Sequence, residues 1–245
     1  MNAPCKAWDL MTDNAVYLQP AFILQQRKFR ETSLIIDVLT RDFGRVTILA
    51  KGVRKPKSKT AGLLQPFIPL SLSYFGKTEL KTLTTVEISK SFDQLQGLAL
   101  YCGFYVNELI TCFLHKYDPH PEVFELYEEC LIRLFNAPEI EVALRIFEVD
   151  LMAAVGYGLQ LDYDAHNNKE VQQLSKYHYN VEQGPVEAAK GAYSGKTLLA
   201  LNSRELSDSQ ILQEAKILMR TVISVYLHGK PLKSRAVINQ IIHHL

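Results

Sequence analysis

The densest group of side chains able to do chemistry is a basic run in the first third of the chain. Residues 51–59 read Lys-Gly-Val-Arg-Lys-Pro-Lys-Ser-Lys, so five of nine are cationic, and no acid occurs between Asp42 and Glu79. Fixed cations along a groove neutralise phosphates and displace their counterions. The run favours a nucleic-acid contact, and the alternative is a solvated loop whose lysines only aid solubility. With neighbouring basic positions, the candidate phosphate-binding residues are Arg27, Arg30, Arg45, Lys51, Arg54, Lys55, Lys57, Lys59, Lys77 and Lys81.

Aromatic residues near this run are candidates for base stacking, which single-strand binders combine with cations. The candidates are Phe29, Phe43 and Tyr74. For Phe43 and Tyr74, packing in a core or a turn is the favoured alternative.

The charge of the chain is divided unevenly along its length. Residues 1–85 hold 13 Lys/Arg and 6 Asp/Glu, which gives +7, whereas residues 86–245 hold 14 and 20, which gives −6. The two sums reproduce the net charge of +1. This division indicates that the first half meets a polyanion and that the second half does so only locally, if at all.

Catalytic and metal-binding patterns are weak by comparison. The string Ser-Gly-Lys-Thr at 194–197 resembles the end of a phosphate-binding P-loop, but the position of the first required glycine is occupied by Lys190. Cys102 and Cys112 would lie about 15 Å apart on one helix, too far to share a tetrahedral metal. We therefore expect no metal, no cofactor and no enzymatic activity.

Hydrophobic periodicity predicts an α+β fold whose first part is a five-stranded barrel. Alternating apolar residues with Gly-containing turns predict strands over 17–26, 32–40, 45–51, 67–75 and 79–87, with a short helix over 58–65 after the third strand. Five strands with a helical insert after the third is the arrangement of the OB fold, a small barrel that binds oligonucleotides.

The period then changes to that of helices. Apolar positions with proline and glycine breaks predict a bundle of helices near 101–113, 122–135, 139–155, 209–228 and 232–245. Residues 159–207 interrupt the pattern and predict a small irregular or two-stranded insert. The expected organisation is an N-terminal extension over 1–16, an OB-like domain over 17–88 and a helical domain over 89–245.

The sequence also predicts where the protein resides. No run of 18 or more apolar residues occurs, residues 1–18 have no apolar signal-peptide core, and the four cysteines show no paired spacing. We therefore expect a reduced, cytoplasmic, nucleoid-associated protein without a membrane segment.

Several stretches in this order resemble the RecO family of bacterial recombination mediators. They cover about residues 20–235; they are Arg-Glu-Thr-Ser-Leu at 30–34, Gly-Arg-Val at 44–46, Ala-Lys-Gly-Val-Arg at 50–54, Leu-Gln-Pro-Phe at 64–67, Glu-Leu-Lys-Thr-Leu at 79–83, Tyr-Val-Asn-Glu-Leu at 105–109, Leu-Arg-Ile-Phe-Glu at 144–148, Gly-Tyr-Gly at 156–158 and Lys-Pro-Leu-Lys-Ser-Arg at 230–235. The resemblance implies an OB fold followed by helices, binding to single- and double-stranded DNA, and annealing of complementary strands. It also implies partners: RecR, and the acidic, Phe-ending tail of single-stranded-DNA-binding protein. With RecR and RecF, such proteins help to load RecA onto coated strands.

The resemblance also directs attention to cations in the helical half. Arg145 adjoins an apolar stripe and suits an acidic tail ending in Phe, but an ion pair with Glu148 carries equal weight. Lys230, Lys233 and Arg235 suit the same tail or a DNA phosphate. Many members of the family carry a four-cysteine zinc module in the insert, whereas this chain has no cysteine there. We expect ordinary packing to hold the insert.

Three other functions stay open. An OB-fold RNA binder would show the same cationic barrel, because positive charge does not choose between sugars. An interaction scaffold would act through the acidic half and would tolerate charge reversal at 55, 57 and 59. An enzyme is the last alternative, and it would require nucleotide hydrolysis that depends on Lys196.

Overall fold

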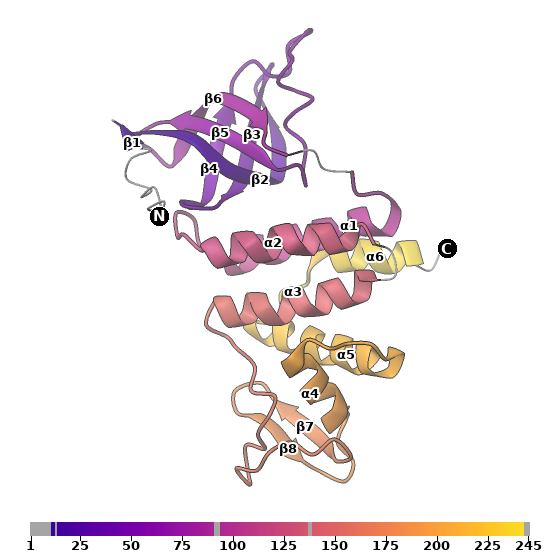
Figure 1. The fold of residues 1–245 in the computed structure, drawn as a ribbon. Coiled ribbons are helices and arrows are strands. Elements are labelled where there is room, and N and C mark those ends of the chain that lie inside the picture. The colour runs from indigo at the N-terminus through magenta and orange to yellow at the C-terminus, as the bar shows by residue number, and fades with distance from the viewer. Residues whose placement is uncertain (1–10, 13, 91–93, 137–138, 243–245) are drawn as a thin grey trace, which may run out of the picture. The chain divides into compact units, whose positions relative to one another are not determined.

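The computed structural model describes residues 11–12, 14–90, 94–136 and 139–242, and it forms two compact units over 1–125 and 126–245 (Figure 1). Most of the extension predicted for 1–16 lies outside the described residues, although β1 (Met11–Thr12) pairs with the strand that follows it. Among the described residues, no helix is long and apolar enough to cross a membrane.

The first unit contains a closed five-stranded barrel, which confirms the OB-like fold predicted from the sequence. The sheet runs β2-β3-β4-β6-β5, and β5 returns to pair with β2. Every pairing is antiparallel except β4 with β6. The strands are β2 (Ala15–Phe29), β3 (Ser33–Thr40), β4 (Gly44–Ala50), β5 (Leu70–Phe75) and β6 (Leu80–Ile88).

Alternation of apolar and polar side chains produces the barrel core. Ile36, Val38, Val46 and Ile48 are at most 1% exposed and belong to one buried cluster. Asp37 lies between two of them in sequence and points to the opposite face, because successive strand residues alternate. A register shift in β2 between Ile23 and Gln25 marks a bulge that changes this alternation at its C-terminal end.

The short helix predicted over 58–65 is absent. Residues 51–69 form turns, with i→i+3 hydrogen bonds such as Ser58 N to Lys55 O (3.1 Å) and Leu63 N to Thr60 O (3.1 Å). Pro56, Gly62 and Pro66 flank or interrupt this stretch, and each disfavours a continuing helix. The basic run is therefore an extended surface loop.

Two helices begin in the first unit, and both contact the barrel. They are α1 (Gly97–Phe113) and α2 (Pro121–Leu134). Asn107 donates from its side-chain nitrogen to the carbonyl of Leu24 (2.8 Å), and the rings of Phe22 and Phe124 lie 5.3 Å apart. Both contacts are made on β2, so this strand serves the barrel core on one face and the helices on the other.

The second unit is helical with a small mixed insert. Helix α5 packs against α3 and α4. The predicted irregular or two-stranded insert is instead a three-stranded sheet in the order β8-β7-β9, followed directly by a helix that periodicity did not reveal. The elements are α3 (Ile140–Ala154), β7 (Lys176–Asn180), β8 (Gly184–Glu187), β9 (Tyr193–Ser194), α4 (Gly195–Ser203), α5 (Ser209–Tyr226) and α6 (Lys233–Ile242).

Candidate nucleic-acid interface

The turn between β2 and β3 and the start of the basic loop are hydrogen-bonded to each other. The backbone nitrogen of Arg54 donates to Thr32 O (2.8 Å), and its guanidinium donates to Arg30 O (3.1 Å). The backbone nitrogen of Gly52 donates to Ser33 Oγ (3.4 Å). Two segments that are about 20 residues apart in sequence thus form one structural corner of the barrel.

Positive backbone dihedrals shape this corner. Gly52 has φ +70° and turns the chain directly after β4. Arg30 has φ +50°, a conformation that is uncommon for a residue with a side chain. The hydrogen bond that Arg30 O accepts from Arg54 holds this conformation, so the cationic side chains start from a fixed backbone.

A cationic depression lies at this corner, and its volume is about 510 Å³. The guanidinium of Arg30 sits 5.3 Å from the centre of the Phe29 ring, so a cation and an aromatic face are presented together. Glu31 also lines the depression and opposes its positive charge. The lining residues of this cationic depression are Phe29, Arg30, Glu31, Thr32, Ser33, Leu49, Lys51, Gly52 and Lys55.

Four further predicted cations of this region do not line the depression but are exposed. Arg54, Lys57 and Lys59 extend along the loop, and all three side chains are exposed. Arg27 is exposed on β2, opposite Ile35 of β3, because this strand continues past the range of 17–26 that the sequence predicts. The structure thus brings Arg30, Lys51 and Lys55 together in the depression, with Arg54 hydrogen-bonded to Arg30 beside them.

Lys77 lies in the β5–β6 turn, away from the depression, whereas Lys81 lies on β6 opposite Ile48 of β4, one position from Leu49 of the depression. Gly76 N donates to Asn14 O (3.0 Å), which places the β5–β6 turn beside the start of β2, while the cationic depression follows its end. Lys77 is exposed, but Lys81 is half-buried, donates to Gly76 O (2.9 Å) and sits 5.5 Å from the Tyr117 ring centre. In OB folds the corresponding two loops flank the face that binds oligonucleotides.

Arg45 is a correction to the sequence prediction. Its side chain is 8% exposed and donates to the carbonyls of Thr111 (2.7 Å) and Leu114 (2.8 Å) near the end of α1. Burial lowers the pKa of this guanidinium, and the nearby Asp37 opposes that effect. Arg45 therefore fastens the helix end to the barrel and is not placed to meet a phosphate.

The three aromatic residues predicted to stack on bases lie in different places. Phe29 borders the cationic depression, whereas Tyr74 is 2% exposed inside the barrel and burial raises the pKa of its hydroxyl. Phe43 is half-buried and packs against the core cluster. Of the three, Phe29 lines the depression and stays a candidate for stacking, whereas Tyr74 and Phe43 pack in or against the core.

Arg145 is the second correction. It is 5% exposed on α3 and forms an ion pair of 2.5 Å with Glu148, whose side chain is fully buried. Of the two equally weighted interpretations, the ion pair is the one present. Breaking such a buried pair would leave an uncompensated charge, so the pair is structural and not a docking site for an acidic tail. Lys230 and Lys233 are exposed and Arg235 is half-buried at the start of α6, so these three stay predictions.

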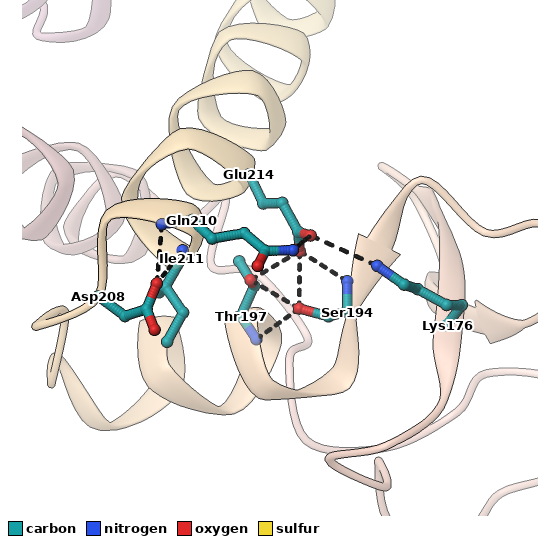
Figure 2. Close-up of polar contacts among 7 residues, drawn as sticks. All are labelled: Lys176, Ser194, Thr197, Asp208, Gln210, Ile211 and Glu214. Atoms are coloured by element: carbon teal, nitrogen blue, oxygen red, sulfur yellow. Dashed lines mark hydrogen bonds and ion pairs between the residues drawn. The ribbon is translucent and has the colours of Figure 1, made fainter.

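The string that resembles a P-loop end has a structural explanation (Figure 2). Ser194 caps α4 by accepting a hydrogen bond from Thr197 N (3.3 Å). One carboxylate oxygen of Glu214, on α5, accepts from Ser194 N (2.8 Å), Ser194 Oγ (2.7 Å) and Thr197 Oγ1 (2.7 Å). An internal carboxylate thus occupies the place that a phosphate would take at this helix start.

This network fastens the insert to the helices. Lys176 on β7 adds an ion pair of 3.5 Å to Glu214. Burial alone would raise the pKa of Glu214, but the hydrogen bonds from Ser194 and Thr197, with Lys176 nearby, lower it to about 2. The prediction of ordinary packing missed this polar connection, and the signal that could have revealed it was the Ser-x-x-Thr spacing at an N-cap.

Metal ligands are not gathered anywhere in the part of the chain that the structure describes: no group of three or more His, Cys, Asp or Glu side chains could hold an ion there. The terminal His243 and His244 lie outside the described residues.

Comparison with known proteins identifies one family along nearly the whole chain. Residues 11–92 match the family described as Recombination protein O N terminal, and residues 94–236 match Recombination protein O C terminal. DNA repair protein RecO of Methylococcus capsulatus is 42% identical over 222 residues, which are 90% of this chain and 92% of that protein. DNA repair protein RecO of Nitrosospira multiformis is 40% identical over 228 residues, or 91% of this chain and 94% of that protein. The resemblance seen in the sequence is confirmed, and the chain belongs to the recombination protein O (RecO) family.

Proposed function

We propose that this chain binds single- and double-stranded DNA through its barrel and anneals complementary strands as a mediator in DNA repair. The observation that carries the proposal is the cationic depression on an OB-like barrel, which Arg30, Lys51 and Lys55 line together with the half-buried Phe29. Cations of this kind neutralise phosphates, and the ring offers a surface to a base. The family membership and the names of the relatives, DNA repair protein RecO, support the same function.

Annealing follows from charge alone and needs no covalent chemistry. Two complementary strands repel each other through their phosphates, and a protein that supplies positive charge to both lowers that repulsion. Residues 43–78 contain no Asp or Glu, so no carboxylate within this stretch weakens its positive charge. Glu31, which lies outside the stretch, is the acidic residue at the depression.

The proposed partners follow the family. We propose that the chain works with RecR and RecF to load RecA, and that it binds the acidic tail of single-stranded-DNA-binding protein. With Arg145 removed from the candidates, Lys230, Lys233 and Arg235 are the cations proposed for that tail or for a DNA phosphate. A nucleoid location in the cytoplasm accompanies this proposal.

The test is annealing of two oligonucleotides coated with the cognate single-stranded-DNA-binding protein, with and without its acidic tail. Lys55→Glu/Lys57→Glu is compared with Lys169→Glu/Lys190→Glu, which makes the same charge change at exposed positions of the second unit. The proposal expects fast annealing that requires the tail and is lost only in the first variant. Equal annealing by both variants would contradict the barrel site.

Competition between RNA and DNA of one sequence distinguishes a DNA-binding protein from an RNA-binding one. Preference for RNA would replace the DNA proposal with the OB-fold RNA binder. Unaffected cellular repair with the Lys55→Glu/Lys57→Glu protein would favour the scaffold.

A further inference from the structure

A pair of stacked tyrosines lies at the end of α5. The rings of Tyr157 and Tyr226 have centroids 4.2 Å apart and planes inclined by 26°. Tyr226 is the last residue of α5, and Tyr157 follows α3 by three positions. Tyr157 is 43% exposed, so the stack ends in a ring that solvent reaches.

The backbone around Tyr157 is open but fixed. Gly156 and Gly158 on either side are exposed, and a Cβ built at Gly156 would meet no atom within 4 Å. Tyr157 N donates to Met152 O (2.7 Å), which ties the residue to the end of α3. The backbone of Tyr157 is thus held in place, while its side chain is 43% exposed.

The segment of the chain that contains Tyr226 differs in charge from the rest of the second half, although its Lys216 is paired with Glu141. Residues 215–245 contain five Lys/Arg and no Asp or Glu, whereas residues 86–245 as a whole sum to −6. The turn after Tyr226 is tightly bonded, with Gly229 N to Ser224 O (2.9 Å) and Lys230 N to Leu227 O (3.0 Å). This turn fixes the backbone of Lys230 four residues from Tyr226, and the Lys230 side chain is exposed.

We propose that the tyrosine pair is a second nucleic-acid site, a stacking platform for the bases of a single strand, with Lys230 neutralising a phosphate of that strand. Flat aromatic faces beside cations bind single strands with little sequence preference, because every base has a face to stack. The site goes beyond the barrel and does not depend on it. One chain with two separate single-strand sites can hold two strands at once, which is what annealing requires.

The observations favour a nucleic acid over an acidic peptide. An acidic peptide ending in Phe could place one ring on this stack, whereas a single strand brings a flat base and a phosphate together at every nucleotide. A nucleobase continues the stack that Tyr157 and Tyr226 already form. An abasic oligonucleotide keeps the phosphates of a single strand and lacks its bases. It therefore shows whether binding depends on base stacking or only on negative charge, which an acidic peptide also carries.

The experiment uses the full-length chain carrying Lys55→Glu/Lys57→Glu, so that the barrel contributes less to binding. A short oligothymidylate and an abasic oligonucleotide of the same length are titrated into this protein and into the same protein with Tyr157→Ala. The proposal expects the thymidylate affinity to fall about 5- to 150-fold, the range for loss of one stacked base, and the abasic affinity to stay unchanged. Tyr157→Phe should retain binding, because it keeps the ring.

A matched control is available in the same unit. Tyr163 is 42% exposed, close to the 43% of Tyr157, but it lies outside the pair. Tyr163→Ala should leave both affinities unchanged.

A second measurement needs no substitution. Thymidines replaced by 5-iodouracil are irradiated in complex with the unaltered chain, and the linked peptides are mapped. Crosslinks at Tyr157 or Tyr226 support the site. Crosslinks confined to the barrel, equal thymidylate affinity with and without the Tyr157 ring, or a Tyr157→Ala defect seen only with an acidic peptide would each overturn it.

Discussion

Replacing Glu214 by glutamine tests whether one carboxylate holds the insert to the helices. The side chain is 13% exposed and accepts three hydrogen bonds through a single oxygen, two from hydroxyls and one from Ser194 N. Glutamine keeps the size but loses the charge, so hydrogen bonds to a carboxylate become weaker bonds to an amide oxygen.

The magnitude follows from the pKa of Glu214, which is lowered from 4.5 to about 2. A shift of one unit corresponds to about 1.4 kcal/mol, so the carboxylate stabilises the folded state by about 3 kcal/mol at neutral pH. Because the folded-state pKa lies below the unfolded one, this stabilisation is present above about pH 4.5 and is lost as the pH falls through 2.

The assay is urea unfolding of the original chain and of Glu214→Gln at pH 7 and at pH 3.5, with hydrogen exchange over residues 172–203. We expect a loss of about 2–3 kcal/mol at pH 7 and a smaller difference at pH 3.5, with faster exchange in β9 and α4. Glu141→Gln is the control, because Glu141 is 56% exposed and pairs with Lys216 on the same α5; an exposed pair contributes about 0–1 kcal/mol. An unchanged stability at pH 7, or a loss that does not depend on pH, would refute the reasoning.

Two further substitutions probe how helix α1 and the chain after it are held to the barrel. Gly44→Ala should lower the free energy of unfolding by about 2 kcal/mol or more, since Gly44 has φ +63° and a Cβ there would lie 2.1 Å from Asp118 O; an unchanged melting temperature would contradict this. Arg45→Leu should cost about 2–3 kcal/mol by leaving the carbonyls of Thr111 and Leu114 unpaired. It should not alter the salt dependence of DNA binding, and a reduced dependence would return Arg45 to the DNA site.

The elements that were predictable from the sequence are those with strong local periodicity. The strands of the barrel alternate apolar and polar residues, and the hairpin from Ser33 to Ala50 has a Gly-containing turn, so short-range patterns suffice. Helix α4 was missed because it is only nine residues long and starts at a glycine within a glycine-rich stretch. The helix expected over 58–65 fits the helical insert that the OB fold has after its third strand. Its hydrophobic periodicity is weak, however, and local turns form there instead.

The candidate site was predictable in part for a different reason. A basic loop is visible in the sequence, but whether one arginine faces water depends on segments far away. The carbonyls that accept from Arg45 lie 66 and 69 residues further along the chain. For Arg145 the sequence leaves two interpretations, an ion pair with Glu148 or a contact with an acidic tail. The i,i+3 spacing is visible in the sequence, but the burial of the two side chains is not. The tyrosine pair joins residues 157 and 226, and no local pattern connects them.

The measurement that tests the central claim most directly is the affinity for single-stranded DNA as a function of salt. We expect the logarithm of the affinity to fall linearly with the logarithm of the salt concentration. Lys55→Glu/Lys57→Glu should reduce that slope by about 1.4, or about 0.7 for each phosphate that the variant no longer neutralises. Lys169→Glu/Lys190→Glu should keep the original slope. If both variants have the same slope as the unaltered chain, the cationic depression does not bind DNA.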